Sequence, residues 1–436
     1  MLRQKEIRLV DRTIVTSKKH RFTVNADMLA SFSFVSFFCV DFLKASLRMV
    51  FGAIGLSSLV VPVCLIWIYF PLILLCIYKP RSIVPDFIAL LAFLGLFFLT
   101  TLLFHPDYAN WYAKDTYGAW DYVFRPDNGL YAYLFLRLID NPKRLLKLLR
   151  ISAFIMIAYQ GCRLIPFLQT GYWTTSNQDG SIHYASYSLK FGYDVLLWAL
   201  VFLYFAFDGK RRIDWIMAVL SIVYIVLGGS RGPFLCIIFF VAVYALVFNK
   251  SKKQKLVFAV LLFSAGTVLF VAYEQILQGL AELLDQFGLR SRIISRLIAG
   301  TVSDDNGRIV LWNATLDMIK ENPFGYGAMG TRHVLDALIW AGYPHNFILE
   351  LIADFGIFIG GGLVVFFAWR SVSILRMQDI REWRGLFLIF LGVFFQLMLS
   401  STYYHRMGFW SALAVGVSIY RERRVNHKKV SYDQVP

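Results

Sequence analysis

Long apolar runs separated by short polar segments make up most of the chain. A transmembrane helix needs about 20 mainly apolar residues, and twelve runs have this length or approach it. They lie near 28–43, 49–78, 84–104, 129–141, 150–168, 187–207, 213–229, 232–248, 256–272, 346–369, 385–401 and 407–420. The second run is overlong and contains Pro62 and Pro71, so we expect it to be kinked or tilted. The pattern predicts an all-α polytopic membrane protein with about 12 transmembrane helices.

One connection, 273–345, is much longer than the others and has helical signals of its own. An apolar stripe predicts a helix near 276–287. A second helix is predicted to begin at Arg308 and to stop at Asn322-Pro323, and a third, short helix is predicted near 328–340. Loops of this length in compact proteins are usually functional. We therefore expect one membrane domain, 1–436, with the large loop 273–345 inserted between transmembrane helices 9 and 10.

Composition supports the membrane assignment, and charge indicates the orientation. Hydrophobic residues make up 58% of the chain and charged residues 17%, which excludes an ordinary soluble enzyme, a disordered protein and a disulfide scaffold. The net charge of +16 would suggest nucleic acid in a soluble protein. With the N-terminus inside, however, 30 of the 44 Lys and Arg residues fall in segments on the cytoplasmic side, as the positive-inside rule requires. Both termini are then cytoplasmic, the large loop lies outside, and no nucleic acid partner is expected.

Sequence motifs for metals and cofactors are missing from the chain. The five cysteines lie in apolar runs without a CxxC pair, which makes a metal or redox role weak. There is no P-loop, HExxH or acidic cluster, so no metal and no cofactor are expected. The polar, basic N-terminus lacks the pattern of a cleavable signal, and the first apolar run is expected to be an uncleaved signal anchor.

Arg231 lies in LGGSRGPFL, between two apolar runs. A charge at this position indicates function by default. The neighbouring glycines let backbone N–H groups approach an anion, and a guanidinium suits phosphate. The alternative is an interfacial arginine that extends to the water at a hairpin tip. The residue alone does not separate the two.

Arg308 and His345 are the two further candidates on the outer side. Arg308 opens a helix, where the dipole disfavours a cation; either Asp304 or Asp305 pairs with it, or it shares an anion with the helix N-terminus. Trp312 lies on the same face. His345 stands where the chain re-enters the membrane, and either it is structural or it acts as a general base on a hydroxyl group. Glu350 and Asp354 do not share its helical face, so a group that orients the ring must come from elsewhere.

Weaker candidates follow from position alone. Arg163, near the outer end of the fifth run, is able to add to an anion site. Lys190 and Asp194 are four residues apart and are expected to pair. Arg332 lies in the large loop and is expected to be solvated there if it does not bind substrate.

These motifs, in their order and spacing, resemble a known family. LGGSRGPF, Arg308 and Trp312 followed by Asn322-Pro323 and GYG, and then HNFILELIADFGIFIG are similar to the O-antigen ligase and O-antigen polymerase superfamily of bacterial inner-membrane glycosyltransferases. The motifs cover about 225–362. The predicted layout, twelve spans with one long outer loop before the tenth, agrees over the whole chain.

The resemblance implies a GT-C type fold and a saccharide donor linked to undecaprenyl pyrophosphate. Arg231 and Arg308 match the family's arginines, which would bind the pyrophosphate, and His345 matches the histidine that would position or deprotonate the acceptor hydroxyl. It implies transfer at the periplasmic face of the bacterial inner membrane, without metal or nucleotide. Trp312, Asn346, Arg163 and Arg332 are the expected substrate-binding residues.

The acceptor stays open. The ligase pattern after the histidine continues with Gly356 in register, but Ile359 stands where that pattern has Gly, Thr or Tyr. A ligase would use a lipid A core sugar, and a polymerase would use another lipid-linked glycan. A transporter of lipid-linked sugars is a more remote alternative, because it would more often show paired repeats and charges near the midplane.

Overall fold

The computed structural model describes residues 25–79, 84–170, 172–176, 182–185, 188–209, 211–228, 232–248, 253, 260, 273–286, 307–338 and 342–433. The chain forms two compact units, Met1–Pro85 and Asp86–Pro436. Each is described by itself. Within these ranges the protein is helical apart from one short hairpin.

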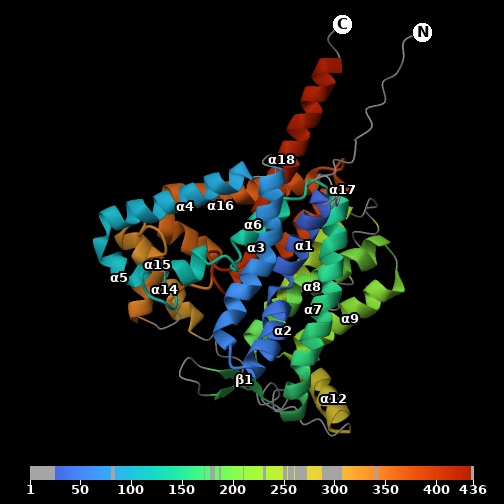
Figure 1. Ribbon diagram of the computed structural model, residues 1–436. Coiled ribbons are helices and arrows are strands. Elements are labelled where there is room, and N and C mark those ends of the chain that lie inside the picture. The colour runs from blue at the N-terminus through green and yellow to red at the C-terminus, as the bar shows by residue number, and fades with distance from the viewer. Residues whose placement is uncertain are drawn as a thin grey trace, which may run out of the picture. The chain divides into compact units, whose positions relative to one another are not determined.

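The first unit is a small helical assembly (Figure 1). Its elements are α1 (Ala26–Phe38), α2 (Val40–Ala53), the 3-10 turn η1 (Ser57–Leu59) and α3 (Val60–Tyr78). Asn25 begins α1, because its side chain accepts a hydrogen bond from Asp27 N. The axes of α1 and α2 differ by 78°. The prediction of a single overlong helix over 49–78 is wrong. The chain leaves helical geometry between Ala53 and Ser57, where Gly55 has φ +74°.

The second unit holds the remaining elements (Figure 1). Up to the hairpin they are α4 (Pro85–Phe104), η3 (Pro106–Tyr108), α5 (Ala109–Tyr112), the π turn η4 (Trp120–Phe124), α6 (Tyr131–Arg137), α7 (Pro142–Thr170), β1 (Trp173–Ser176) and β2 (Ile182–Ala185). After it come α8 (Leu189–Gly209), α9 (Arg212–Leu227), α10 (Gly232–Phe248), α12 (Tyr273–Gln286), α14 (Arg308–Glu321), α15 (Gly330–Leu338), α16 (Phe347–Arg376), α17 (Arg381–Phe394), η5 (Phe395–Met398) and α18 (Met407–Asp433). The two strands pair antiparallel, and α8 packs against α7, α9 and α17.

Most predicted helices have a counterpart. Five described helices are long and apolar enough to cross a membrane, and the bent pair α1 and α2 adds a sixth. Helix α10 has the bounds of its predicted run, whereas α9 and α17 end before theirs. The run 256–272 lies almost wholly outside the described residues. A helical protein with several candidate membrane spans is thus confirmed, whereas the number twelve stays a prediction. In the large loop, α12, α14 and α15 match the three predicted helices.

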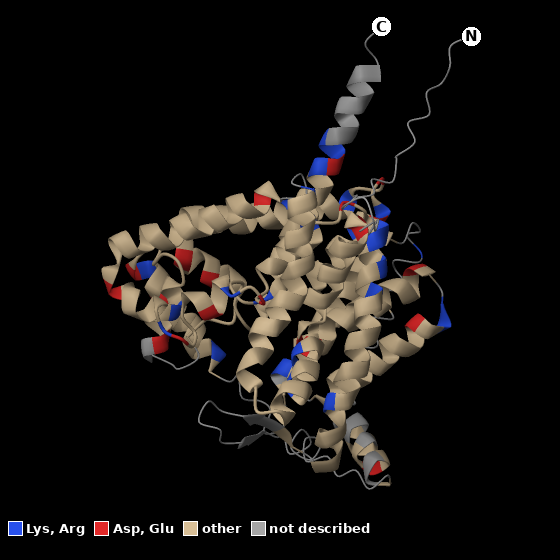
Figure 2. Cartoon of the chain, viewed as in Figure 1, with Lys and Arg blue, Asp and Glu red and all other residues tan. Residues whose placement is uncertain are grey.

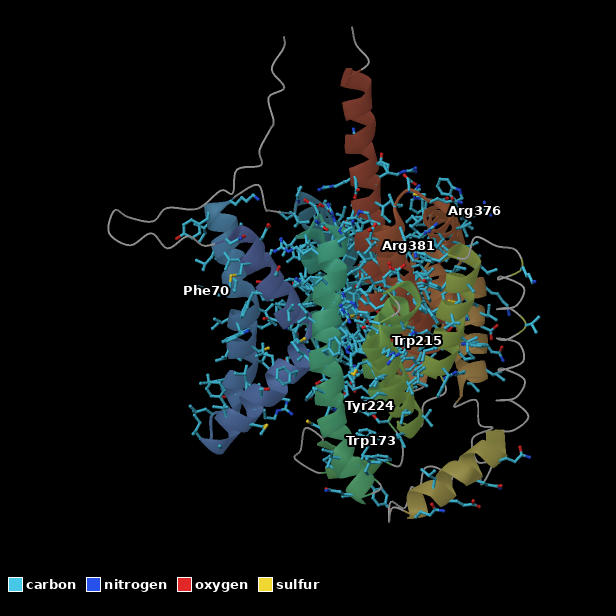
Figure 3. All side chains as sticks on the ribbon, turned by 90° about the vertical axis from the view of Figure 1, so that its right-hand side faces the viewer. Phe70, Trp173, Trp215, Tyr224, Arg376 and Arg381 are labelled. Carbon is cyan, nitrogen blue, oxygen red and sulfur yellow. The ribbon has the colours of Figure 1, made fainter. Side chains whose placement is uncertain are left out.

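Ion pairs gather the helix ends of the second unit that the charge pattern assigned to one side. They are Arg137 with Asp86 (2.8 Å), Arg421 with Asp86 (2.9 Å), Arg150 with Asp214 (2.8 Å), Arg423 with Asp379 (3.3 Å), Lys143 with Glu382 (3.5 Å) and Arg381 with Asp208. Basic and acidic segments accordingly lie together where α17 begins (Figure 2). In Figure 3, Arg376 and Arg381 lie toward this end of the second unit and Trp173 of the hairpin toward the other.

The helix α16 is broken at Gly356, which has φ +81°. The turn that follows α14 inserts at this break. Tyr326 N donates to Ala353 O (2.9 Å), Gly327 N to Asp354 O (2.9 Å), and Ile357 N to Pro323 O (2.9 Å). A Cβ atom on Gly325 would lie 2.4 Å from Gly356 N, and one on Gly356 would lie 2.5 Å from Phe324 O. Both positions therefore require glycine, since the two backbones touch.

Candidate functional site

His345 lies in the short segment between α15 and α16 and is held from three sides. Its backbone has φ +52°, which is uncommon for a residue other than glycine. Its Nδ1 accepts a hydrogen bond from Ser401 N (3.4 Å), and its ring packs on Tyr343 with 4.4 Å between ring centroids. Trp312 Nε1 donates to the carbonyl of Pro344 (2.8 Å). The ring is thus positioned from α14 and from the segment between η5 and α18.

The segment that contacts His345, residues 399–406, is itself fixed by α16. Thr402 donates to Glu350 Oε1, and the hydroxyls of Tyr403 (3.0 Å) and Tyr404 (2.9 Å) donate to Asp354 Oδ2. Burial raises the pKa of both phenols, which keeps them protonated as donors. The orienting group that the sequence did not supply is therefore the Ser401 amide, and the two α16 carboxylates act on His345 only through this segment.

Arg406 completes the hold on Ser401. Its Nε donates to Ser401 Oγ (3.1 Å), and Ser401 has φ +73°. A non-glycine residue in this conformation costs free energy and is kept only where its surroundings fix it. Arg406 also brings a guanidinium into the site, which the sequence analysis did not single out.

Arg308, the first residue of α14, lies close enough to His345 to affect its ionisation. Burial and then the positive charge of Arg308 lower the pKa of His345 from 6.5 to about 4. The imidazole is therefore neutral at neutral pH. Because Nδ1 is a hydrogen-bond acceptor, the single proton of the neutral ring resides on Nε2.

Another aromatic residue, Tyr193 on α8, lies in the same neighbourhood. Both Arg308 and Arg406 are within electrostatic range of its hydroxyl. A Cβ atom on Gly232 would lie 1.9 Å from this hydroxyl, so the start of α10 touches Tyr193 directly. Arg231, the residue before Gly232, lies outside the described residues. The aspartates 304 and 305, which were considered as partners of Arg308, lie outside them as well.

Arg332 is buried rather than solvated. Its residue is 6% exposed, because the guanidinium lies among three tyrosine rings. Its Cζ is 3.7 Å from the centroid of Tyr122, 5.2 Å from that of Tyr117 and 5.5 Å from that of Tyr343. Tyr343, which packs on His345, thus contacts both the Arg332 guanidinium and the imidazole.

Asn346 and Arg163 have structural partners in the described residues. Asn346 begins α16, and its side chain accepts from Ile348 N (3.0 Å) and Leu349 N (3.3 Å). Arg163 pairs with Asp194 (3.1 Å), and Lys190 contacts the same carboxylate (3.8 Å), as expected for its spacing. Among the described residues, no three His, Cys, Asp or Glu side chains are arranged to hold a metal ion.

Residues 216–366 match the family model described as O-Antigen ligase. Over these residues the chain is similar to the O-antigen ligase family. The matched segment extends from α9 into α16, and therefore includes Arg308, Trp312, Arg332, His345 and Asn346. No curated protein matches the chain. Members of this family are glycosyltransferase-like enzymes that act as ligases or polymerases.

Some residues that surround His345 lie outside the matched segment. Ser401 and Arg406 follow the matched segment, and Tyr193 precedes it. Sequence reasoning missed these three because each is an ordinary residue type in its local context. The only available signal was the cluster STYYHR, which places two tyrosines, a histidine and an arginine between two apolar runs.

Proposed function

We propose that this protein transfers a saccharide from undecaprenyl pyrophosphate to an acceptor hydroxyl at the periplasmic face of the bacterial inner membrane. The observation that supports this most is the proximity of Arg308 and His345 within the segment that matches the O-antigen ligase family. These two residues are far apart in the sequence. Arg308 and Arg406 also both act electrostatically on the Tyr193 hydroxyl, so cations and an imidazole share one neighbourhood.

The arginines would hold the diphosphate of the donor. A guanidinium offers several N–H donors in a plane, which suits phosphate oxygens. Arg308 is one of these diphosphate-binding arginines and lies in the described part of the chain. We assign Arg231 the same role, because the neighbouring Gly232 lies on the Tyr193 hydroxyl, which is near Arg308. When the acceptor oxygen bonds to the anomeric carbon, the bond from that carbon to the diphosphate oxygen breaks. The electron pair leaves on the diphosphate, where the arginines stabilise the new negative charge.

His345 is better suited to position the acceptor than to deprotonate it. A group with a pKa of about 4 is a weak base at neutral pH. With its proton on Nε2, the ring donates a hydrogen bond to an oxygen atom of the acceptor or the donor. The proton of the acceptor hydroxyl then passes to the departing diphosphate or to water. Metal independence remains part of the proposal, as does binding of the saccharide by Trp312, Asn346, Arg163 and Arg332.

The acceptor is a lipid A core sugar if the protein is a ligase and a second lipid-linked glycan if it is a polymerase. Both reactions need the same donor site. We favour the ligase, because the matched family model has this description and because of the His345-Asn346 motif.

The decisive experiment replaces Arg308 by Lys in the full-length protein in proteoliposomes. A point charge does not reproduce the planar donors, so saccharide transfer from the lipid-linked donor should fall about 10²-fold to 10³-fold, the usual loss when one such donor is removed. The matched control is Arg370→Lys on α16, whose guanidinium lies over the Trp369 ring. Full activity in Arg308→Lys would refute the role of Arg308.

A further inference from the structure

The turn between α14 and α15, residues 322–329, and the first two residues of α15 have an unusual hydrogen-bond arrangement. The turn is not helical, yet its backbone N–H groups are satisfied one after another by protein. Gly325 N donates to Asn322 O, Tyr326 N to Ala353 O, Gly327 N to Asp354 O, Ala328 N to Thr101 Oγ1, Met329 N to the Tyr404 hydroxyl, Gly330 N to Gly327 O and Thr331 N to Asp354 Oδ1. Irregular backbone is tolerated at membrane depth only when its polar groups are satisfied in this way.

The partners of the turn lie inside two candidate membrane spans. Thr101 belongs to α4, and Ala353 and Asp354 belong to α16. A Cβ atom on Gly327 would lie 2.5 Å from the side chain of Thr101, so the backbone of the turn is pressed against α4. The turn is therefore at the level of these helices and not above their ends.

Phe324, in the same turn, faces outward although it is a large apolar residue. It is 80% exposed. The backbone bond from Ile357 N to Pro323 O (2.9 Å) fixes it beside the exposed face of α16, where Phe358 is 78% and Ile359 63% exposed. Such a face on a candidate span contacts lipid, and Phe324 continues it.

The end of α14 carries charged side chains that indicate the boundary between hydrocarbon and head groups. Asp317 and Lys320 form an ion pair of 2.7 Å, and both side chains are largely exposed. Charged side chains are costly within the hydrocarbon, so this pair belongs at the level of the head groups or the water. Phe324 follows Lys320 by four residues, beyond the end of α14.

We propose that the turn dips into the membrane and that the Phe324 ring lies among the acyl chains of the bilayer. The large loop is then not wholly outside the membrane, since it returns to the lipid between α14 and α15. The inference rests on the candidate spans and the hydrogen bonds of the turn. It does not depend on the proposed glycosyl transfer.

Site-directed spin labelling tests the proposal. A label is attached to Phe324→Cys or, as the matched control, to Lys320→Cys, in a full-length protein whose five native cysteines are replaced, reconstituted in phospholipid vesicles. We expect oxygen, which concentrates in acyl chains, to relax the label at 324 several-fold more than a water-soluble nickel chelate does, and the reverse at 320. A nickel effect at 324 equal to that at 320 would overturn the proposal.

The same samples separate bilayer lipid from the lipid tail of the donor. Undecaprenyl phosphate is added to the vesicles, and the oxygen effect at 324 is measured again. We expect no change if bilayer acyl chains surround the ring. A label that is lipid-exposed only after this addition would show that the surface accommodates the polyprenyl chain, and the proposal would be wrong.

Discussion

At the scale of single residues, His345 shows how a fold converts an ordinary side chain into a candidate catalytic group. Burial and Arg308 keep the ring neutral, and the Ser401 amide fixes which nitrogen bears the proton. A histidine with its ordinary pKa would be partly charged near neutrality. The surroundings of His345 leave the ring in one charge state, the neutral one, at neutral pH.

This leads to a pH prediction. The folded-state pKa of His345, about 4, is below the ordinary 6.5. The unfolded chain therefore binds more protons between these values, so the contribution of His345 to stability is present above pH 6.5 and is lost as the pH falls toward 4. Saccharide transfer should show no inflection near pH 6.5 from this group, and the acid limb should lie near pH 4.

The measurement compares pH–rate profiles of the wild-type protein and His345→Gln, whose amide NH₂ also donates a hydrogen bond. We expect the glutamine variant to keep part of the activity that His345→Ala loses. An inflection near pH 6.5 that is present in the wild type and lost in His345→Gln would contradict the positioning role.

The sequence singled out individual candidate residues but not the groups that surround them. Arg308, His345 and Trp312 stand out because charged or aromatic groups next to apolar runs are conspicuous. The Ser401 amide and the tyrosine rings around Arg332 have no such signal, since their roles arise from contacts between distant segments. For the same reason the sequence indicated solvation for Arg332, which the fold buries.

At the scale of elements, α16 and the turn after α14 form one backbone assembly. Hydrophobic length predicted α16, and Asn322-Pro323 predicted the end of α14. The break at Gly356 was not predicted. A glycine within an apolar run is common. What makes glycine necessary at position 356 is the close approach of the Phe324 and Gly325 backbone.

The assembly predicts a strong contrast between two glycines of α16. In Gly356→Ala the new Cβ would lie 2.5 Å from Phe324 O, at a residue with φ +81°. The variant should unfold more easily and lose activity. In Gly361→Ala nothing lies within 4 Å of the new Cβ, and the change should be neutral or stabilise by up to about 1 kcal/mol.

Thermal unfolding in detergent, followed by loss of the monodisperse peak, compares the two variants. Equal unfolding temperatures for Gly356→Ala and the wild type would mean that the turn does not touch α16 as described.

At the scale of the whole molecule, the ion pairs and the charge pattern agree on one end of the second unit. The helix ends joined by Arg137, Arg381 and Arg421 are those that the positive-inside rule assigned to the cytoplasm. Hydropathy and charge thus predict which ends gather together. They do not predict every helix length, because packing and local breaks decide where α9 and α17 end.

Cysteine labelling in intact spheroplasts measures this orientation. In a background without native cysteines, Asp140→Cys, at a side chain that is 94% exposed near α6, should react with a membrane-impermeant maleimide only after the membrane is permeabilised. Lys320→Cys on α14 should react without permeabilisation. The reverse result would place the site of Arg308 and His345 on the cytoplasmic side.

The position of Ser401 and Arg406 beyond residue 366 has a practical consequence for protein engineering. A chimera that exchanges only residues 216–366 between two relatives would combine a histidine from one parent with the segment that holds it from the other. Such hybrids should be assembled with residues 399–406 as part of the transplanted segment, even though the end of α16 and all of α17 lie between the two pieces in the sequence.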